Sequence, residues 1–413
     1  MTRDPVLAVG VMMTVGLLAG LLARRLKFPR ITGYIIIGIL LSPSVLNLVP
    51  RTTLDSLDII TSFALGIIAY AIGGSLRLES IRKLGRSVAW VTIAESLGAL
   101  IAVTLLIAFI GPHILEIPNA TFLHSYFPMA LIIGAAVCPA APAVTLAVIR
   151  ELRARGPLTA TLLAVVALDD AIGVVVFAIA LGVALPLMAG AGGMSLYQML
   201  GIPSLEIVKS IGIGAAFGFA LIYMAKLART RGLLLVVVLG MILLCIGVTD
   251  YLGISFILAS MVVGFVVRNR IEESDPFVVV GGIEDVVFAA FFVLAGMHFD
   301  AGVMRTAGIL ALLIFVGRFA GKYFGVKASA EMSQAPGVVR KYLGFALLPE
   351  AGVTIGLALR AKSVIPDPTF SSILLNGILA SVILNEVVAP PLTRYAILRA
   401  GEAGEAVEPA PEK

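Results

Sequence analysis

Two stretches of this sequence share one pattern, and that pattern decides how the chain is expected to fold. The first starts at Pro139 and reads Pro-Ala-Ala-Pro-Ala-Val-Thr-Leu-Ala-Val-Ile-Arg. The second starts at Pro349 and reads Pro-Glu-Ala-Gly-Val-Thr-Ile-Gly-Leu-Ala-Leu-Arg. Each has a second helix breaker, Pro142 or Gly352, three residues after the first. Because proline removes a backbone donor and clashes with the preceding turn, each stretch predicts a helix interrupted near its middle.

The composition places both stretches in a membrane protein. Of the 413 residues, 60% are apolar and only 13% are charged, and the mean hydropathy is +1.07. Soluble proteins are nearer half apolar and a quarter charged. The composition therefore excludes a soluble enzyme, a disordered protein and a nucleic-acid-binding module. Cys138 and Cys245 both lie in apolar runs and show no metal-ligand spacing.

Thirteen apolar segments predict an all-α polytopic fold, because a chain in lipid must satisfy its own backbone hydrogen bonds. Their approximate limits are 5–23, 31–49, 57–76, 87–111, 128–149, 158–187, 204–225, 232–249, 251–267, 281–298, 303–326, 337–361 and 369–396. The interrupted stretches lie in the fifth and twelfth segments. Their offset of seven is odd, so the two copies cross the membrane in opposite directions. The prediction is thirteen transmembrane helices with inverted repeats and two crossing broken helices, which mark a substrate site near the midplane.

The basic residues orient the chain. Twenty-three of the 30 Lys and Arg residues fall in one set of alternate loops, Lys322 among them, and five fall in the other set. The positive-inside rule places the richer set in the cytoplasm of a cell (inner) membrane protein. The N-terminus is then outside and the C-terminus inside, which agrees with an odd number of spans. The short acidic tail, residues 399–413, is expected to be disordered.

Two adjacent carboxylates, Asp169 and Asp170, lie in the sixth segment about twelve residues from its cytoplasmic end. At ~1.5 Å per residue they are ~18 Å deep, close to the bilayer centre. One aspartate at this depth costs ~3 kcal/mol, so it persists where it is functional or paired. Neighbouring side chains on a helix point ~100° apart, so the two carboxylates face different partners. We interpret them as a cation and proton site.

Four further charged residues fall inside predicted spans and are not assigned to loops or helix ends. Arg318 lies in the eleventh segment at a depth similar to that of the aspartates, and its expected counter-ion is Asp169. Arginine stays charged, so it can balance a carboxylate but cannot carry a proton. Glu350 stands between the two breakers of the twelfth segment, where it either tunes the site or holds the helix ends. Glu95 and Glu386 are expected to be structural hydrogen-bonding acids.

The inverted halves, the broken helix before an Asp-Asp helix and the basic residue in the eleventh segment resemble bacterial sodium/proton antiporters. The family is the cation:proton antiporter superfamily, of the NapA and NhaA type, and the resemblance covers about residues 5–398. The supporting stretches are residues 28–43, 168–170, 291–299 and 348–353. The resemblance implies a secondary active exchanger of Na⁺ for H⁺, with Li⁺ and K⁺ as other cations. It implies no enzyme activity and no cofactor.

The resemblance also implies a homodimer of two-domain subunits, in which a core domain carries the ion and moves as an elevator. The dimerisation domain comprises 1–83 and 231–300, the core domain 84–190 and 301–398, and the linker helix 191–230. Asp170 corresponds to the main cation ligand and Asp169 to the residue that pairs with a base.

Two positions depart from the family pattern. Arg318 stands where electrogenic members have lysine, so we expect no proton-releasing lysine. Cys138 precedes Pro139 where many members have an acid, which leaves the identity of the cation open.

The expected mechanism is competition of Na⁺ and H⁺ for Asp170, because burial favours a neutral carboxyl and a nearby cation favours the charged form. Exchange is 1:1 if Asp169 stays paired with Arg318, and electrogenic if both aspartates take up protons.

Two alternatives stay open. A potassium/proton exchanger of the Kef type usually carries a nucleotide-binding domain, of which the sequence shows no sign. An organic-anion symporter on the same fold would need a larger polar cavity. The sequence has no Walker motif that would indicate ATP as the energy source.

Overall fold

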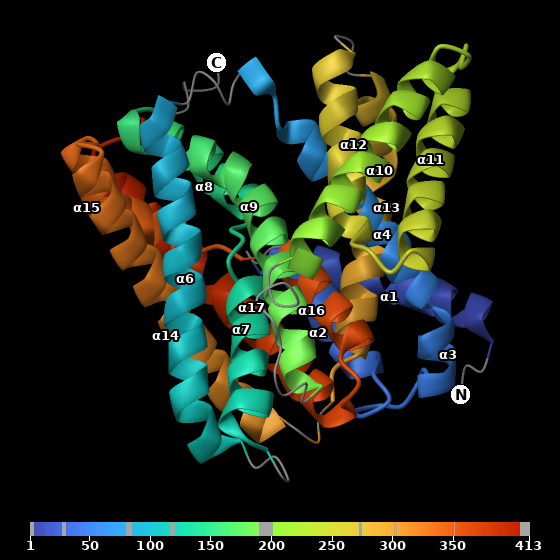
Figure 1. Cartoon of the computed structure of the whole chain (residues 1–413), viewed down its shortest axis with the longest axis horizontal. Helices are drawn as coiled ribbons and strands as arrows, with labels where there is room; N and C mark the ends of the chain where they lie inside the picture. The colour runs from blue at the N-terminus through green and yellow to red at the C-terminus, as the bar shows by residue number, and fades with distance from the viewer. Residues whose placement is uncertain are drawn as a thin grey trace, which may run out of the picture.

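The computed structural model describes residues 4–404, apart from 27–29, 80–84, 116–119, 190–200, 272–274, 301, 303 and 351, and over these residues it is helical and has no strand (Figure 1). The elements are α1 (Pro5–Arg25), α2 (Arg30–Leu41), α3 (Arg51–Ser56), α4 (Asp58–Ser75), α6 (Gly85–Ile114), η1 (Phe122–Tyr126), α7 (Phe127–Ala136), α8 (Pro142–Glu151), α9 (Pro157–Met188), α10 (Ile202–Ala225), α11 (Arg231–Tyr251), α12 (Phe256–Arg270), α13 (Asp275–Met297), α14 (Met304–Met332), α15 (Gly337–Ala346), α16 (Gly352–Val364) and α17 (Pro368–Arg399).

Each predicted apolar segment coincides with one helix or, for the fifth and twelfth, with a pair of short helices. Within the described part of the chain, nine helices are long and apolar enough to cross a membrane. The prediction of an all-α, multi-pass membrane protein is therefore confirmed. Helices α2 and α12 have 12 and 15 residues, fewer than the ~20 of a full span, and the total of thirteen spans stays a prediction.

The two interruptions lie where the breakers predict them, and they lie against each other. Helix α7 ends at Ala136 and α8 begins at Pro142, while α15 ends at Ala346 and α16 begins at Gly352. The amide of Ala141 donates a hydrogen bond to the carbonyl of Pro349, at 2.7 Å. The two non-helical connections thus satisfy part of each other's backbone.

The helices pack in two groups (Figure 1). In the first group α14 packs along α6 and α17, and α7, α9, α15 and α16 complete it. In the second group α4 packs along α12 and α2 along α13, with α1 and α11 beside them. Helix α10 contacts α12 and α11 and, to a smaller extent, α9.

Glycines bring α6 and α14 into backbone contact. A Cβ atom on Gly321 would overlap the carbonyl of Gly98, and one on Gly325 would overlap the carbonyl of Ala94. Small residues at such positions let two helices approach closely. The approach places Lys322 of α14 directly opposite Glu95 of α6.

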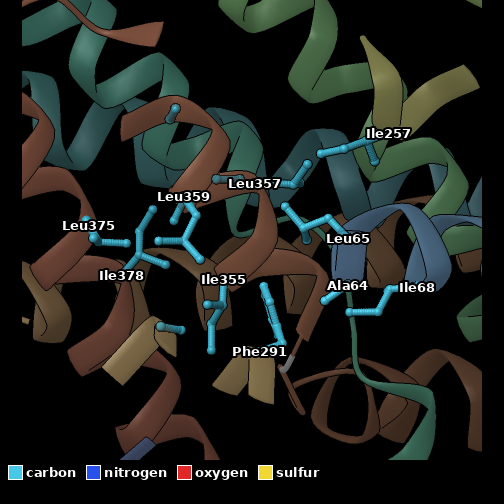
Figure 2. Close-up of a cluster of buried hydrophobic side chains, with 14 of the residues drawn as sticks. Ala64, Leu65, Ile68, Ile257, Phe291, Ile355, Leu357, Leu359, Leu375 and Ile378 are labelled. Atoms are coloured by element: carbon cyan, nitrogen blue, oxygen red, sulfur yellow. The ribbon is translucent and has the colours of Figure 1, made fainter. Parts of the chain in front are cut away.

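The two groups meet on an apolar surface, which is shown in Figure 2. Leu65 of α4, Ile257 of α12 and Phe291 of α13 lie on one side, and Ile355 and Leu357 of α16 lie on the other. All five side chains are buried. A Cβ atom on Gly356 would overlap the side chain of Leu65, so the contact between α16 and α4 is close.

The prediction of a disordered tail is wrong for residues 399–404. Helix α17 continues to Arg399, and the buried carboxylate of Glu402 accepts hydrogen bonds from the amides of Leu158 (2.6 Å) and Thr159 (2.7 Å). Helix α9 begins after Gly156, which has no side chain to cap it, so Glu402 satisfies amides that the helix leaves free. Residues 405–413 lie outside the described residues.

Candidate functional site

The aspartate pair lies in the middle of α9, beside the interruption between α7 and α8. Asp169 and Asp170 are both buried. One turn further along α9, a Cβ atom on Gly173 would lie 2.5 Å from Cγ of Pro139. A glycine at this position therefore lets α9 pack closely against the broken helix and sets the aspartates next to it.

Asp169 belongs to a fully buried cluster with a lysine, a glutamate and a serine. Nζ of Lys322 donates to Oε2 of Glu95 at 2.5 Å and to Oδ2 of Asp169 at 3.2 Å. The Ser96 hydroxyl donates to Oδ1 of Asp169 at 2.7 Å and lies 3.2 Å from Oε1 of Glu95. One ammonium group thus serves two carboxyl groups, and the cluster is neutral when the two share one proton.

This cluster corrects two predictions. The partner of Asp169 is Lys322 and not Arg318, and a buried lysine is present in the eleventh segment. Lys322 lies four residues before the end of the predicted segment 303–326 and is counted there with the cytoplasmic bases, but α14 continues to Met332, which places Lys322 well inside the helix. The four-residue spacing of Arg318 and Lys322, which puts both on one face of a helix, was the signal that could have found it.

Arg318 holds the ends of the broken helices. Its Nε donates to the carbonyl of Val137 at 2.6 Å, one Nη donates to Pro139 at 2.8 Å, and the other donates to Leu348. These carbonyls end α7 and follow α15, where the helix dipoles place partial negative charge. Glu350 lies 4.0 Å from Nε of Arg318 and is the nearest carboxylate to it. The fully buried guanidinium therefore neutralises helix ends, and only in part a carboxylate.

Three other predicted residues, Glu350, Cys138 and Gly352, make packing or hydrogen-bond contacts around the two helix interruptions. Glu350 accepts a hydrogen bond from Nδ2 of Asn385 on α17, at 2.5 Å. The Cys138 thiol donates to the carbonyls of Ser96 and Gly134, at 3.2 Å each. A Cβ on Gly352 would lie 3.1 Å from the ring of Phe292.

Pro142 begins α8, and its side chain lies outside the described residues. Glu386 is buried on α17. Sequence reasoning missed Ser96 and Asn385, since neither stands out by type or spacing.

Of the two adjacent aspartates, Asp170 is the one that remains available for a ligand. It is 6% exposed, and its Oδ1 accepts no hydrogen bond from any residue that the structure describes. A buried charged oxygen without a partner is costly, so the site favours either a proton or a cation there. The neighbouring Asp169 is already engaged by Lys322 and Ser96.

The chain was compared with known proteins. Residues 11–395 match the family model described as sodium/hydrogen exchanger, transmembrane. Over 396 residues the chain is 26% identical to the Na(+)/H(+) antiporter NhaS4 of Synechocystis sp., and the match covers 90% of this chain and 93% of that protein.

Solved structures of the sodium proton antiporter MjNhaP1 from Methanocaldococcus jannaschii share the fold. One, determined at pH 8, has a TM-score of 0.75 at 18% identity and covers 97% of this chain and 99% of that one. A second, from electron microscopy, has a TM-score of 0.70 at 17% identity and covers 97% and 98%.

The family match extends across the broken helices, the aspartate pair and the Arg318–Lys322 face of α14. The broken helices, the aspartate pair and Arg318 are the features that carry the resemblance to sodium/proton antiporters, and Lys322 is added by the structure. With its membrane helices and a buried ionisable cluster between them, this chain belongs to the sodium/hydrogen exchanger family of transporters and is not an enzyme.

Proposed function

We propose that this protein exchanges Na⁺ for H⁺ by competition of the two ions for the carboxylate of Asp170. The observation that carries the proposal is the unpartnered, buried oxygen of Asp170 beside an aspartate already engaged by Lys322. A bound Na⁺ stabilises the ionised carboxylate and a bound proton neutralises it, so the two exclude each other. The broken helices add backbone carbonyls that can complete the coordination of a cation.

The transport movement that we propose is an elevator. The core domain (84–190 and 301–398) moves against the dimerisation domain (1–83 and 231–300), through which two copies associate, and residues 191–230 link the domains. The packing of the helices in two groups supports this division, as does the apolar contact between them (Figure 2). An apolar surface can slide without breaking hydrogen bonds.

We further propose thirteen membrane helices with inverted repeats, an NhaA-like fold, the N-terminus outside and the C-terminus inside an inner membrane. The excess of basic residues in alternate loops supports the orientation.

Asp170→Asn tests the central proposal. The amide cannot exchange a proton for a cation, so Na⁺-driven H⁺ movement in proteoliposomes is expected to fall to the level of empty vesicles. Asp285→Asn is the matched control, because Asp285 is exposed on α13 and the chemical change is the same. Activity retained by Asp170→Asn would contradict the proposal. Substituting Li⁺ or K⁺ in the same assay establishes which cation is accepted.

The stoichiometry is tested with a clamped membrane potential. Exchange of 1:1 requires a pair between Asp169 and Arg318, whereas Asp169 contacts Lys322. Without that pair, both aspartates can take part in proton uptake. We therefore propose electrogenic exchange, and rates that do not respond to voltage would contradict it.

A further inference from the structure

Glu386 on α17 is a buried acid that has no role in the proposed exchange at Asp170. The residue is 3% exposed, and neither carboxylate oxygen accepts a hydrogen bond from the described residues. Leaving an ionised carboxylate buried and unpaired is as unfavourable as breaking a buried ion pair. The environment therefore accommodates the neutral carboxyl.

Among the described residues, no basic side chain forms an ion pair with Glu386. Glu350 is the charged group that acts on it, and its effect is repulsive. Arg318 is already engaged by Glu350 and by the helix ends. From the second helix group, the hydroxyl of Thr32 on α2 faces Glu386, yet over the described residues Thr32 Oγ1 has no hydrogen-bond partner.

The charge balance of the first helix group leads to the same conclusion. Apart from Glu402, whose carboxylate caps the first turn of α9, its buried acids outnumber its buried bases by three, the acids being Glu95, Asp169, Asp170, Glu350 and Glu386 and the bases Arg318 and Lys322. The first of the three positive charges that balance these acids is the proton or cation on Asp170. The second is the proton that Glu95 and Asp169 share around Lys322. Glu350 has Arg318 as its partner. The third positive charge is left for Glu386.

We propose that Glu386 is a second proton-binding site, distinct from Asp170, and that its carboxyl group keeps this proton for as long as it is buried, as it is in the arrangement seen here. A proton fits better than Na⁺, because a cation needs several oxygen ligands and neither carboxylate oxygen of Glu386 has a polar partner within hydrogen-bond distance among the described residues. Helix α17 lies in one helix group and α2 in the other. A movement that separates them exposes Glu386 to water, where it can ionise.

Infrared difference spectroscopy of the solubilised protein tests the proposal without requiring transport. The wild type is expected to show the carbonyl stretch of a buried protonated carboxyl that persists above the pH at which an exposed glutamate ionises. Glu386→Gln should remove this band, and Asp170→Asn should keep it. Glu206→Gln, which changes a half-buried acid on α10, is the matched control and should also keep it.

Three outcomes would overturn the proposal. The first is a spectrum of Glu386→Gln identical to that of the wild type, and the second is a band that Na⁺ abolishes at constant pH, which would make the position a cation site. The third applies if Glu386→Gln does not fold: Glu386→Asp should then shift the band, and an unshifted band refutes the assignment. A wild type that binds this proton but moves no Na⁺ would refute the exchange proposal alone.

Discussion

At the scale of single residues, Lys322 decides the charge state of the site. Its ammonium group lies between Glu95 and Asp169, and all three side chains are fully buried. The two carboxyl groups cannot both be ionised cheaply around one base, so one proton is held in common. Asp169 is thereby kept from binding the cation that we assign to Asp170.

Lys322→Gln is expected to destabilise the protein by about 3–5 kcal/mol, because removing one partner leaves a buried carboxylate uncompensated. The melting temperature in detergent should fall, and exchange should be lost. Adding Glu95→Gln to this variant removes one of the two acids and should recover most of the stability. A double variant no more stable than Lys322→Gln would show that the cluster does not act as one unit.

At the scale of elements, the contact of α6 with α14 positions that cluster. The carbonyl of Gly98 faces Gly321 with no room for a Cβ atom between them. Gly321→Ala should push the two helices apart and lower the stability by about 1–3 kcal/mol. Gly308→Ala on the same helix is the control, since a Cβ there meets no described atom within 4 Å. It should be neutral or stabilise by about 0.5–1 kcal/mol. Thermal unfolding of both variants measures the difference.

The interruptions of the two broken helices were predictable from the sequence, because the residues that cause them lie in the same stretch. The contacts between distant segments were not predictable. The gaps before α8 and α16 follow from breakers within the same stretch. The pairing of Lys322 depends on how far α14 continues past residue 326 and on the close approach of α14 to α6 at Gly321 and Gly98. The capping of α9 by Glu402 likewise joins positions more than 240 residues apart, so a tail that reads as polar and acidic was expected to be disordered.

At the scale of the whole molecule, the apolar surface between the two helix groups limits how they can move. Leu65 of α4 and Gly356 of α16 lie in direct contact across it. In Leu65→Cys/Gly356→Cys the smaller side chain at 65 makes room for the new thiol. Oxidation should lock the groups and abolish exchange, and a reductant should restore it. The native cysteines are both buried.

The single variant Leu65→Cys, treated in the same way, should keep its activity. Full exchange by the oxidised double variant, with the cross-link shown by mass spectrometry, would mean that the groups do not slide at this surface.

The hydrogen bonds between Glu402 and the first turn of α9 attach the end of the described chain to the helix that carries the aspartates. Any protein, fusion or tag that captures residues 399–404 competes with α9 for the same carboxylate. A molecule that binds this segment would loosen the first turn of α9 without contacting Asp169 or Asp170.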